Sequence, residues 1–175
     1  TLESLKDPAN GLDQNSEQVA SGYYQLACVI FRQVGDLVKG EMLAREAHRI
    51  RIHCYGNDHQ EVGLSGNLLA NNLTEQGNLG DETGRLAERF LAISIRNEGC
   101  NGFRTAVGNK NLFNRHTYLS NRLLISDEER EHLLKAKSYC TEAVRIYTEI
   151  YDSTRPTTIA LASKVPAVTL MICLI

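Results

Sequence analysis

The chain has 175 residues and a mass of 19.5 kDa, enough for one domain or slightly more. It is 42% hydrophobic and 23% charged with a net charge of −2, which excludes the disordered and fibrous classes and gives no support to a nucleic-acid partner. Aromatic residues make up only 6% and Trp is absent, so the core must be aliphatic and rich in alanine, which favours helices.

The five cysteines are odd in number and widely spaced, which excludes a CxxC metal pair and a dense disulfide framework. A reducing compartment is the simpler expectation, and we therefore predict a cytoplasmic protein. The chain begins without Met, a basic segment or an apolar segment, so no signal peptide is visible and we expect the chain to be a fragment.

The sequence contains an internal repeat. Residues 43–56 align without gaps on residues 86–99, at an offset of 43 residues. A third copy ends at Asp152, where the offset has grown to 53, so about ten extra residues lie near residues 118–137. One offset that recurs along the chain is typical of stacked repeats, and it argues against a compact bundle with accidental similarity.

Each repeat is predicted to form two helices within a single all-α domain. The approximate repeats are residues 13–55, 56–98, 99–151 and a partial unit at 152–175.

The second repeat shows the expected pair of helices most clearly. Asp58 is followed three residues later by Glu61, the pattern of an N-terminal capping box, and apolar residues then keep helical spacing up to a break at residues 76–78. A second helix follows and ends near Gly99, where glycine suits a left-handed cap. Ser126 begins a similar capping box in the third repeat.

The partial fourth repeat departs from this pattern. Pro166 falls where the second repeat has Ala70, inside the expected first helix, so this helix should kink or stop near Val165 at a cost of about 3 kcal/mol. The apolar tail that follows either folds back over the last hairpin or belongs to an array that continues, and we favour continuation. The tail is too short for the roughly 20 residues of a membrane span and contains a proline, so we expect no membrane crossing.

The second repeat resembles the first-helix region of the tetratricopeptide repeats (TPRs) of kinesin light chains and related proteins. The positions that fit are Gly56, Asp58, His59, Val62, Asn67, Leu69, Ala70, Gln76 and Gly77. Gln60 stands where proline is usual, and the period of 43 exceeds the 34 of the ordinary repeat. The resemblance covers about residues 13–165. It implies a right-handed α-α superhelix, an α-solenoid, whose first helices line a concave groove for peptide segments of partner proteins.

The resemblance also implies which residues line the groove. In the second repeat they are Asn67, Asn71 and Thr74. In the third repeat they are Lys110, Asn114 and Thr117. In the first repeat they are Tyr24, Cys28 and Phe31, which would make that end apolar. Asparagine amides offer a donor and an acceptor to an extended peptide backbone. The alternative is that these are ordinary solvated positions of a helix.

Metal binding and catalysis find little support. Four potential metal ligands lie within twelve residues: His48, His53, Cys54 and His59. Their six-residue spacings splay side chains around a helix, so we expect no metal site. His116 and His132 are isolated in the sequence. The motifs GxSxG, HExxH, GxGxxG and the P-loop are absent, so we expect no enzymatic activity and no cofactor.

The predicted function is therefore that of a protein-interaction module that binds peptide segments of partner proteins, without a nucleic-acid or membrane partner. Two alternatives stay open. The chain could be a structural spacer in a larger multidomain protein, or an accessory helical domain of an enzyme whose catalytic part lies outside it. The sequence indicates neither the partner nor the oligomeric state.

Overall fold

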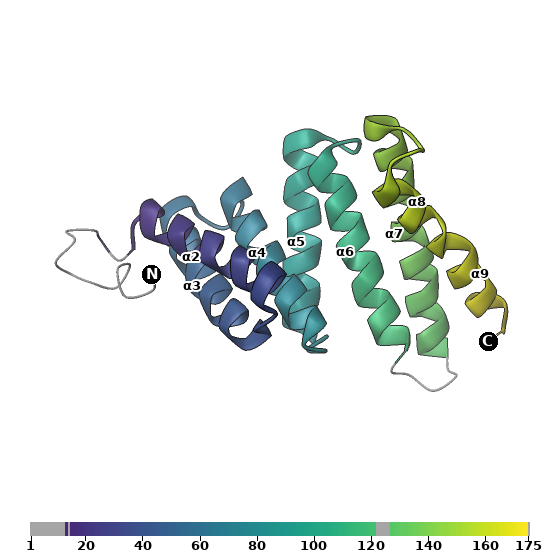
Figure 1. Cartoon of the computed structure of the whole chain (residues 1–175), viewed down its shortest axis with the longest axis horizontal. Coiled ribbons are helices and arrows are strands. Elements are labelled where there is room, and N and C mark those ends of the chain that lie inside the picture. The colour runs from purple at the N-terminus through teal and green to yellow at the C-terminus, as the bar shows by residue number, and fades with distance from the viewer. Residues whose placement is uncertain (1–12, 14, 122–126, 175) are drawn as a thin grey trace. The chain divides into compact units, whose positions relative to one another are not determined.

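The computed structural model describes residues 13, 15–121 and 127–174, and this part of the chain is helical without a β-strand. The chain forms two compact units, residues 1–78 and 79–175, called here the N-terminal unit and the C-terminal unit. Each of them has its own set of packed helices (Figure 1).

The N-terminal unit is built from α2 (Glu17–Val29), the π-helix η2 (Ile30–Val34), α3 (Leu37–Tyr55) and α4 (Gln60–Glu75). Helix α3 lies between α2 and α4 and packs against both. The buried apolar side chains are aliphatic or alanine with one tyrosine: Val19, Ala20, Tyr23, Ala27, Ile30, Leu43, Ala44, Ala47, Ile50, Val62, Leu68, Leu69, Ala70 and Leu73. The expectation of an aliphatic, alanine-rich core is confirmed in this unit.

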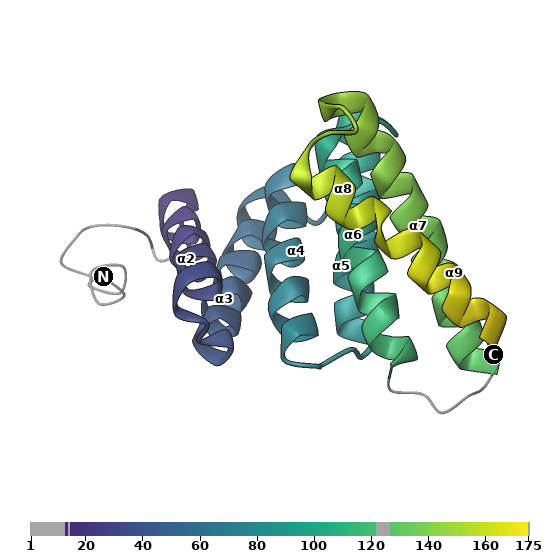
Figure 2. The ribbon, with the colours of Figure 1, turned by 45° about the vertical axis from the view of Figure 1, so that its right-hand side comes forward.

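The C-terminal unit is built from α5 (Asp81–Glu98), α6 (Phe103–Ser120), α7 (Asp127–Tyr151), α8 (Pro156–Ala162) and α9 (Lys164–Leu174). Helix α6 packs against α5 and α7, and both α8 and α9 pack on α7, along which α9 runs (Figure 2). One buried cluster joins α6, α7, α8 and α9: Ala106, Phe113, Leu133, Ala136, Cys140, Ala143, Ile146, Tyr147, Leu161 and Val168.

The ends of the long helices agree with the repeat in the sequence. Helices α3, α5 and α7 end at Tyr55, Glu98 and Tyr151, the last residues of the three predicted repeats. Helix α7 has 25 residues where α5 has 18, so part of the predicted insertion lengthens this helix. The region of the predicted insertion, near residues 118–137, also contains residues 122–126, which lie outside the described residues.

The residue that follows each of these helices has a positive φ. Gly56 has φ +73° and ψ 171°, and Gly99 has φ +78° and ψ 177°. At Gly99 we expected a left-handed cap, but the observed ψ is extended. A positive φ combined with an extended ψ is accessible essentially to glycine alone. Asp152 stands at the equivalent point after α7 and also has a positive φ, +87°. The positive φ therefore recurs at Asp152, where the residue is not glycine.

Helix α4 begins one residue later than the sequence predicted. Its N-cap is His59, whose Nδ1 accepts the backbone N–H of Glu61 at 3.2 Å, and not Asp58. His59 has the extended backbone that an N-cap requires (φ −76°, ψ 148°), which places Asp58 in the preceding turn. Helix α4 ends at Glu75, as predicted. The predicted cap Ser126 lies outside the described residues.

The helix break expected near Val165 occurs two residues earlier, at Ser163, between α8 and α9. Pro166 is thus the third residue of α9, in the first turn, where the backbone N–H has no intrahelical acceptor to lose. The tail continues as α9 and buries Val168, which is 4% exposed, in the cluster of this unit. The tail therefore packs on α7, the second helix of the last hairpin.

Candidate functional site

Asn67 and Asn71 lie one turn apart on α4, and both are half-buried. Thr74, one turn further on, is only 7% exposed, and its Oγ1 donates a hydrogen bond to the backbone oxygen of Ala70 at 2.8 Å. Buried threonines in helices satisfy their hydroxyls in this way. Thr74 therefore contributes to packing, and the two asparagines are the polar part of this face.

Lys110, Asn114 and Thr117 follow the same spacing on α6 and are all half-buried. The Oγ1 atom of Thr117 donates to the backbone oxygen of Phe113 at 2.9 Å. The ammonium of Lys164 lies 5.5 Å from the ring centroid of Phe113, within the range of a cation–π contact. These three residues form a face of the C-terminal unit, whereas the two asparagines of α4 form a face of the N-terminal unit.

The two faces differ in charge as well as in sequence. Helix α4 carries two carboxylates, Glu61 and Glu75, and no Lys or Arg. Helix α6 carries Arg104, Lys110 and Arg115 and no Asp or Glu. The functional group that the two faces have in common is thus the asparagine amide.

The equivalent positions of the first repeat are Tyr24, Cys28 and Phe31, and all three are half-buried. Burial, with the neighbouring Cys28 thiol as the next contribution, raises the pKa of Tyr24 to about 12. Burial also raises the pKa of Cys28. Both side chains are therefore neutral near pH 7, although the charges of Arg51 and Arg32 lie close enough to act on them.

Arg51 on α3 is a buried charged residue that the sequence analysis missed. It is 4% exposed; its Nη2 lies 2.8 Å from Oε2 of Glu61, and its Nη1 donates to the Glu61 backbone oxygen at 3.0 Å. The guanidinium also lies 4.2 Å from the ring centroid of Tyr24. Arg51 thus joins α2, α3 and α4. Its only signal in the sequence was its place between Ile50 and Ile52.

His116 and His132 form a second group that sequence reasoning missed, since it treated them as isolated. Their Nδ1 atoms lie 3.0 Å apart between α6 and α7, and the Tyr139 ring stacks on His116 at a centroid distance of 5.7 Å. Burial, and next the charge of Arg115, lowers the pKa of His116 to about 4. Burial and the charge of Lys135 lower the pKa of His132. At pH 7 the pair is neutral, so one ring donates to the other.

The histidines and cysteine near residue 54 have separate contacts. His48 Nδ1 lies 3.1 Å from Ser65 Oγ, His59 caps α4, and Cys54 Sγ lies 3.1 Å from the backbone oxygen of Asn15. Among the residues that the structure describes, no three metal-ligating side chains come together. These residues serve packing and capping.

The chain was compared with known proteins. No protein-family model matches it, and no curated protein matches it. Among solved structures it is similar to BtubC (BKLC) from P. vanneervenii, a kinesin light chain-like TPR protein, with 15% sequence identity and a TM-score of 0.56. The match covers 88% of this chain and 64% of BtubC, so the chain spans less than two thirds of that protein. The likeness shows a TPR-like helical-repeat fold, an α-solenoid.

Residues 156–173 are long and apolar enough, by length and composition alone, to cross a membrane. Core helices of soluble proteins pass the same test, but only 22% of this stretch is buried within the chain. The stretch is also divided at Ser163 and packs one side on α7. Its exposed side therefore calls for an explanation of its own.

Proposed function

We propose that this chain is a protein-interaction module of the kinesin-light-chain-like TPR subtype, which binds extended peptide segments of partner proteins on the faces of α4 and α6. The binding residues are Asn67, Asn71, Lys110, Asn114 and Thr117. The TPR-like fold supports the general role of a helical scaffold.

One observation carries the proposal. Asn71 and Asn114, 43 residues apart, stand at equivalent points of the repeat, and both amides are half-buried on the first helix of their repeat. A half-buried amide keeps one side open and offers both a donor and an acceptor, which matches the alternating N–H and C=O groups of an extended peptide. Its partial burial also restricts the side chain before a ligand binds, which lowers the entropy that binding must overcome.

The proposed role is binding and not catalysis. The TPR-like neighbour supports a scaffold, and two groups with strongly shifted pKa values, His116 and Tyr24, are held in contacts between helices. Shifted pKa values occur in structural networks as well as in active sites, so these two groups are not by themselves a sign of catalysis.

The test begins with peptides selected from a phage-displayed library on the immobilised whole chain. A selected peptide is then titrated into Asn67→Ala combined with Asn71→Ala, and separately into Asn114→Ala. We expect the double variant to lose capture of peptides that occupy the α4 face, because the hydrogen bonds to the peptide backbone are lost, and Asn114→Ala to bind peptides of the α6 face at least tenfold more weakly. The helical circular dichroism signal should not change.

Asn97→Ala is the matched control, because Asn97 is an exposed asparagine on α5, the second helix of its repeat. This variant should bind the selected peptides as the wild type does. Unchanged affinity in the double variant would contradict the assignment of the α4 face.

A further inference from the structure

The turn between α5 and α6 contains an Asn–Gly dipeptide, Asn101–Gly102. The sequence has a second one, Asn10–Gly11, which lies outside the described residues. Asn101 is exposed, and Gly102 is the N-cap of α6. In such a dipeptide the backbone nitrogen of the glycine can attack the side-chain amide of the asparagine, because glycine has no Cβ to obstruct the approach. The turn therefore presents a reactive amide to water.

Packing holds glycine at residue 102. Its φ of −70° is one that any residue adopts, but a Cβ there would lie 2.3 Å from the Cβ of Glu98, far inside contact distance. Glu98 is itself held across the turn, because its Oε2 accepts the backbone N–H of Arg104 at 2.9 Å. The turn therefore excludes a side chain at residue 102, and Asn101 keeps a glycine as its neighbour.

An arginine holds the side chain of Asn101. The Nη2 atom of Arg145, on α7, donates a hydrogen bond to Oδ1 of Asn101 at 2.8 Å. Hydrogen bonds to Glu142 and Glu149 raise the pKa of Arg145, so its guanidinium keeps its charge. Attack on Cγ of Asn101 places negative charge on Oδ1, and a cationic donor at this distance stabilises that charge.

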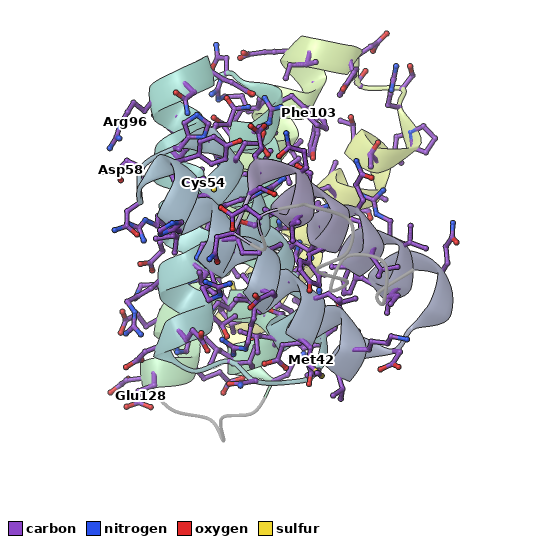
Figure 3. The ribbon with its side chains drawn as sticks, turned by 90° about the vertical axis from the view of Figure 1, so that its left-hand side faces the viewer. Met42, Cys54, Asp58, Arg96, Phe103 and Glu128 are labelled. Carbon is purple, nitrogen blue, oxygen red and sulfur yellow. The ribbon has the colours of Figure 1, made fainter. Side chains whose placement is uncertain are left out.

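The repeat shows that a carboxylate fits at this point. Asn15, Asp58 and Asn101 follow one another at 43-residue intervals, and each precedes the N-cap of the first helix of its repeat. Figure 3 labels Asp58 and, directly after Gly102, Phe103, which mark two of these turns. The second repeat thus has in its sequence the aspartate that hydrolysis of the Asn101 amide would produce.

The first repeat has the same contact without the glycine. Oδ1 of Asn15 accepts a hydrogen bond from Nη2 of Arg49 at 3.0 Å, but the next residue is Ser16. In both turns the backbone nitrogen that would attack donates to a backbone oxygen, at 2.8 Å from Ser16 and at 3.2 Å from Gly102. The serine side chain and the shorter bond both oppose the attack, so Asn15 is an internal reference for Asn101.

We propose that Asn101 is a site of spontaneous modification, at which the asparagine is converted to aspartate and isoaspartate. The backbone nitrogen of Gly102 loses its proton to hydroxide and attacks Cγ of Asn101. The N–Cγ bond forms, the Cγ–Nδ2 bond breaks, and Nδ2 takes a proton from water and leaves as ammonia. Arg145 stabilises the charge on Oδ1 during the attack.

The product of this step is a five-membered succinimide, which one water molecule then opens. Opening at Cγ gives aspartate with an ordinary backbone. Opening at the main-chain carbonyl carbon gives isoaspartate, whose backbone is one carbon longer. One ammonia is released for each water consumed, and the turn gains a carboxylate. The conversion does not depend on the proposed peptide binding.

The test incubates the folded whole chain at pH 8 and then digests it with trypsin. Cleavage after Arg96 and Arg104 releases one peptide that contains Asn101 and also Asn97, an exposed asparagine of α5. We expect a gain of one mass unit at Asn101 at least tenfold faster than at Asn97. The rate should rise with pH, because the attacking nitrogen must lose its proton, and an isoaspartate-specific methyltransferase should label the converted chain.

Variants of the two arginines test the role of the side-chain contact. Arg145→Met should convert Asn101 at least threefold more slowly, whereas loss of a simple restraint would speed the conversion. Arg49→Met is the matched control, because it removes the equivalent contact with Asn15 and should leave the rate at Asn101 unchanged. In 8 M urea, where the chain is unfolded, Arg145→Met and the wild type should convert at the same rate.

Two results would overturn the proposal. Conversion of Asn101 no faster than that of Asn97 or Asn15 would show that the folded turn does not permit the attack. A rate in folded Arg145→Met equal to or above that of the wild type would contradict the role of Arg145. Asn101→Gln, which would have to close a six-membered ring, should show no gain of mass at residue 101.

Discussion

The two units bury different kinds of polar contact between neighbouring helices. In the N-terminal unit the contact is charged, because Arg51 pairs with Glu61 beneath Tyr24. In the C-terminal unit it is neutral, because His116 and His132 share a hydrogen bond beside Tyr139. Packed helix pairs of the same kind thus contain a buried ion pair in one unit and a neutral hydrogen-bonded pair in the other. This difference determines how the stability of each unit changes with pH and with substitution.

The turns extend the comparison. An ion pair spans the turn after α3, from Arg51 to Glu61, and another spans the turn after α5, from Glu98 to Arg104, with the signs exchanged. The second pair is more open, since the Arg104 side chain is 38% exposed and that of Arg51 is 5% exposed. The repeat therefore preserves the place of the pair and the backbone of the turn, whereas charge sign and burial vary.

The largest expected effect is the acid sensitivity of the C-terminal unit. The pKa of His116 is lowered from its ordinary 6.5 to about 4, so the unfolded chain binds a proton at higher pH than the native chain does. The stability from this group is fully present above pH 6.5 and is lost as the pH falls toward 4, a loss of about 3 kcal/mol. Urea unfolding of the wild type between pH 7 and pH 4.5 measures it.

His116→Leu should reduce this slope, because the group that takes up the proton on unfolding is removed. The charged groups around the pair are Arg115 on α6 and Glu128, Glu131 and Lys135 on α7. Glu88 on α5 acts on Arg115 and Tyr139. An identical slope in His116→Leu and the wild type would contradict the assignment.

The next effect concerns the two ion pairs. Arg51→Met should destabilise the chain by about 2 kcal/mol, because it leaves Glu61 without its partner, a loss reduced by the 36% exposure of the Glu61 side chain. Arg104→Met should cost less than about 1 kcal/mol, as exposed pairs do. Urea unfolding at pH 7 compares them, with Arg49→Met as the control for an exposed pair. Equal losses of unfolding free energy in Arg51→Met and Arg104→Met would contradict the distinction between a buried and an exposed ion pair.

The smallest effect compares the turns after α5 and α7. Asp152→Gly should stabilise the chain by about 1 kcal/mol, because glycine adopts the positive φ of this position without strain. Gly99→Ala should destabilise it by a similar amount for the converse reason. Thermal unfolding measures both changes. A lower midpoint for Asp152→Gly would show that the contacts of the Asp152 carboxylate with Ser153 Oγ and the Thr154 N–H outweigh the strain.

The features that the sequence predicted correctly are local in origin. The end of α5 at Gly99 and the helix break close to Pro166 follow from the backbone preferences of glycine and proline. The offset of 43 residues follows from the alignment of the repeats in the sequence. The burial of Arg51 and the contact of His116 with His132 could not be predicted, because they depend on how separate helices pack. Spacing alone separates the two histidines by sixteen residues and gives no sign of the contact.

The candidate site shows the same limit. The resemblance implied Asn71 and Asn114 as groove residues, and the structure shows both to be half-buried. The resemblance also implied Thr74, which is 7% exposed, because a family pattern does not say how closely a neighbouring helix covers a position in this chain. The sequence left two alternatives open for the apolar tail for a similar reason, since apolar composition alone does not identify what covers it.

The central claim is that peptides bind on α4 and α6. The most direct measurement places a photo-crosslinking residue at successive positions of a selected peptide, irradiates the complex with the whole chain, and identifies the attached residues by mass spectrometry. The account predicts crosslinks to residues of one of the two faces, either on α4 close to Asn67 and Asn71 or on α6 close to Asn114 and Thr117. Crosslinks confined to α3, α5 or α7 would contradict it.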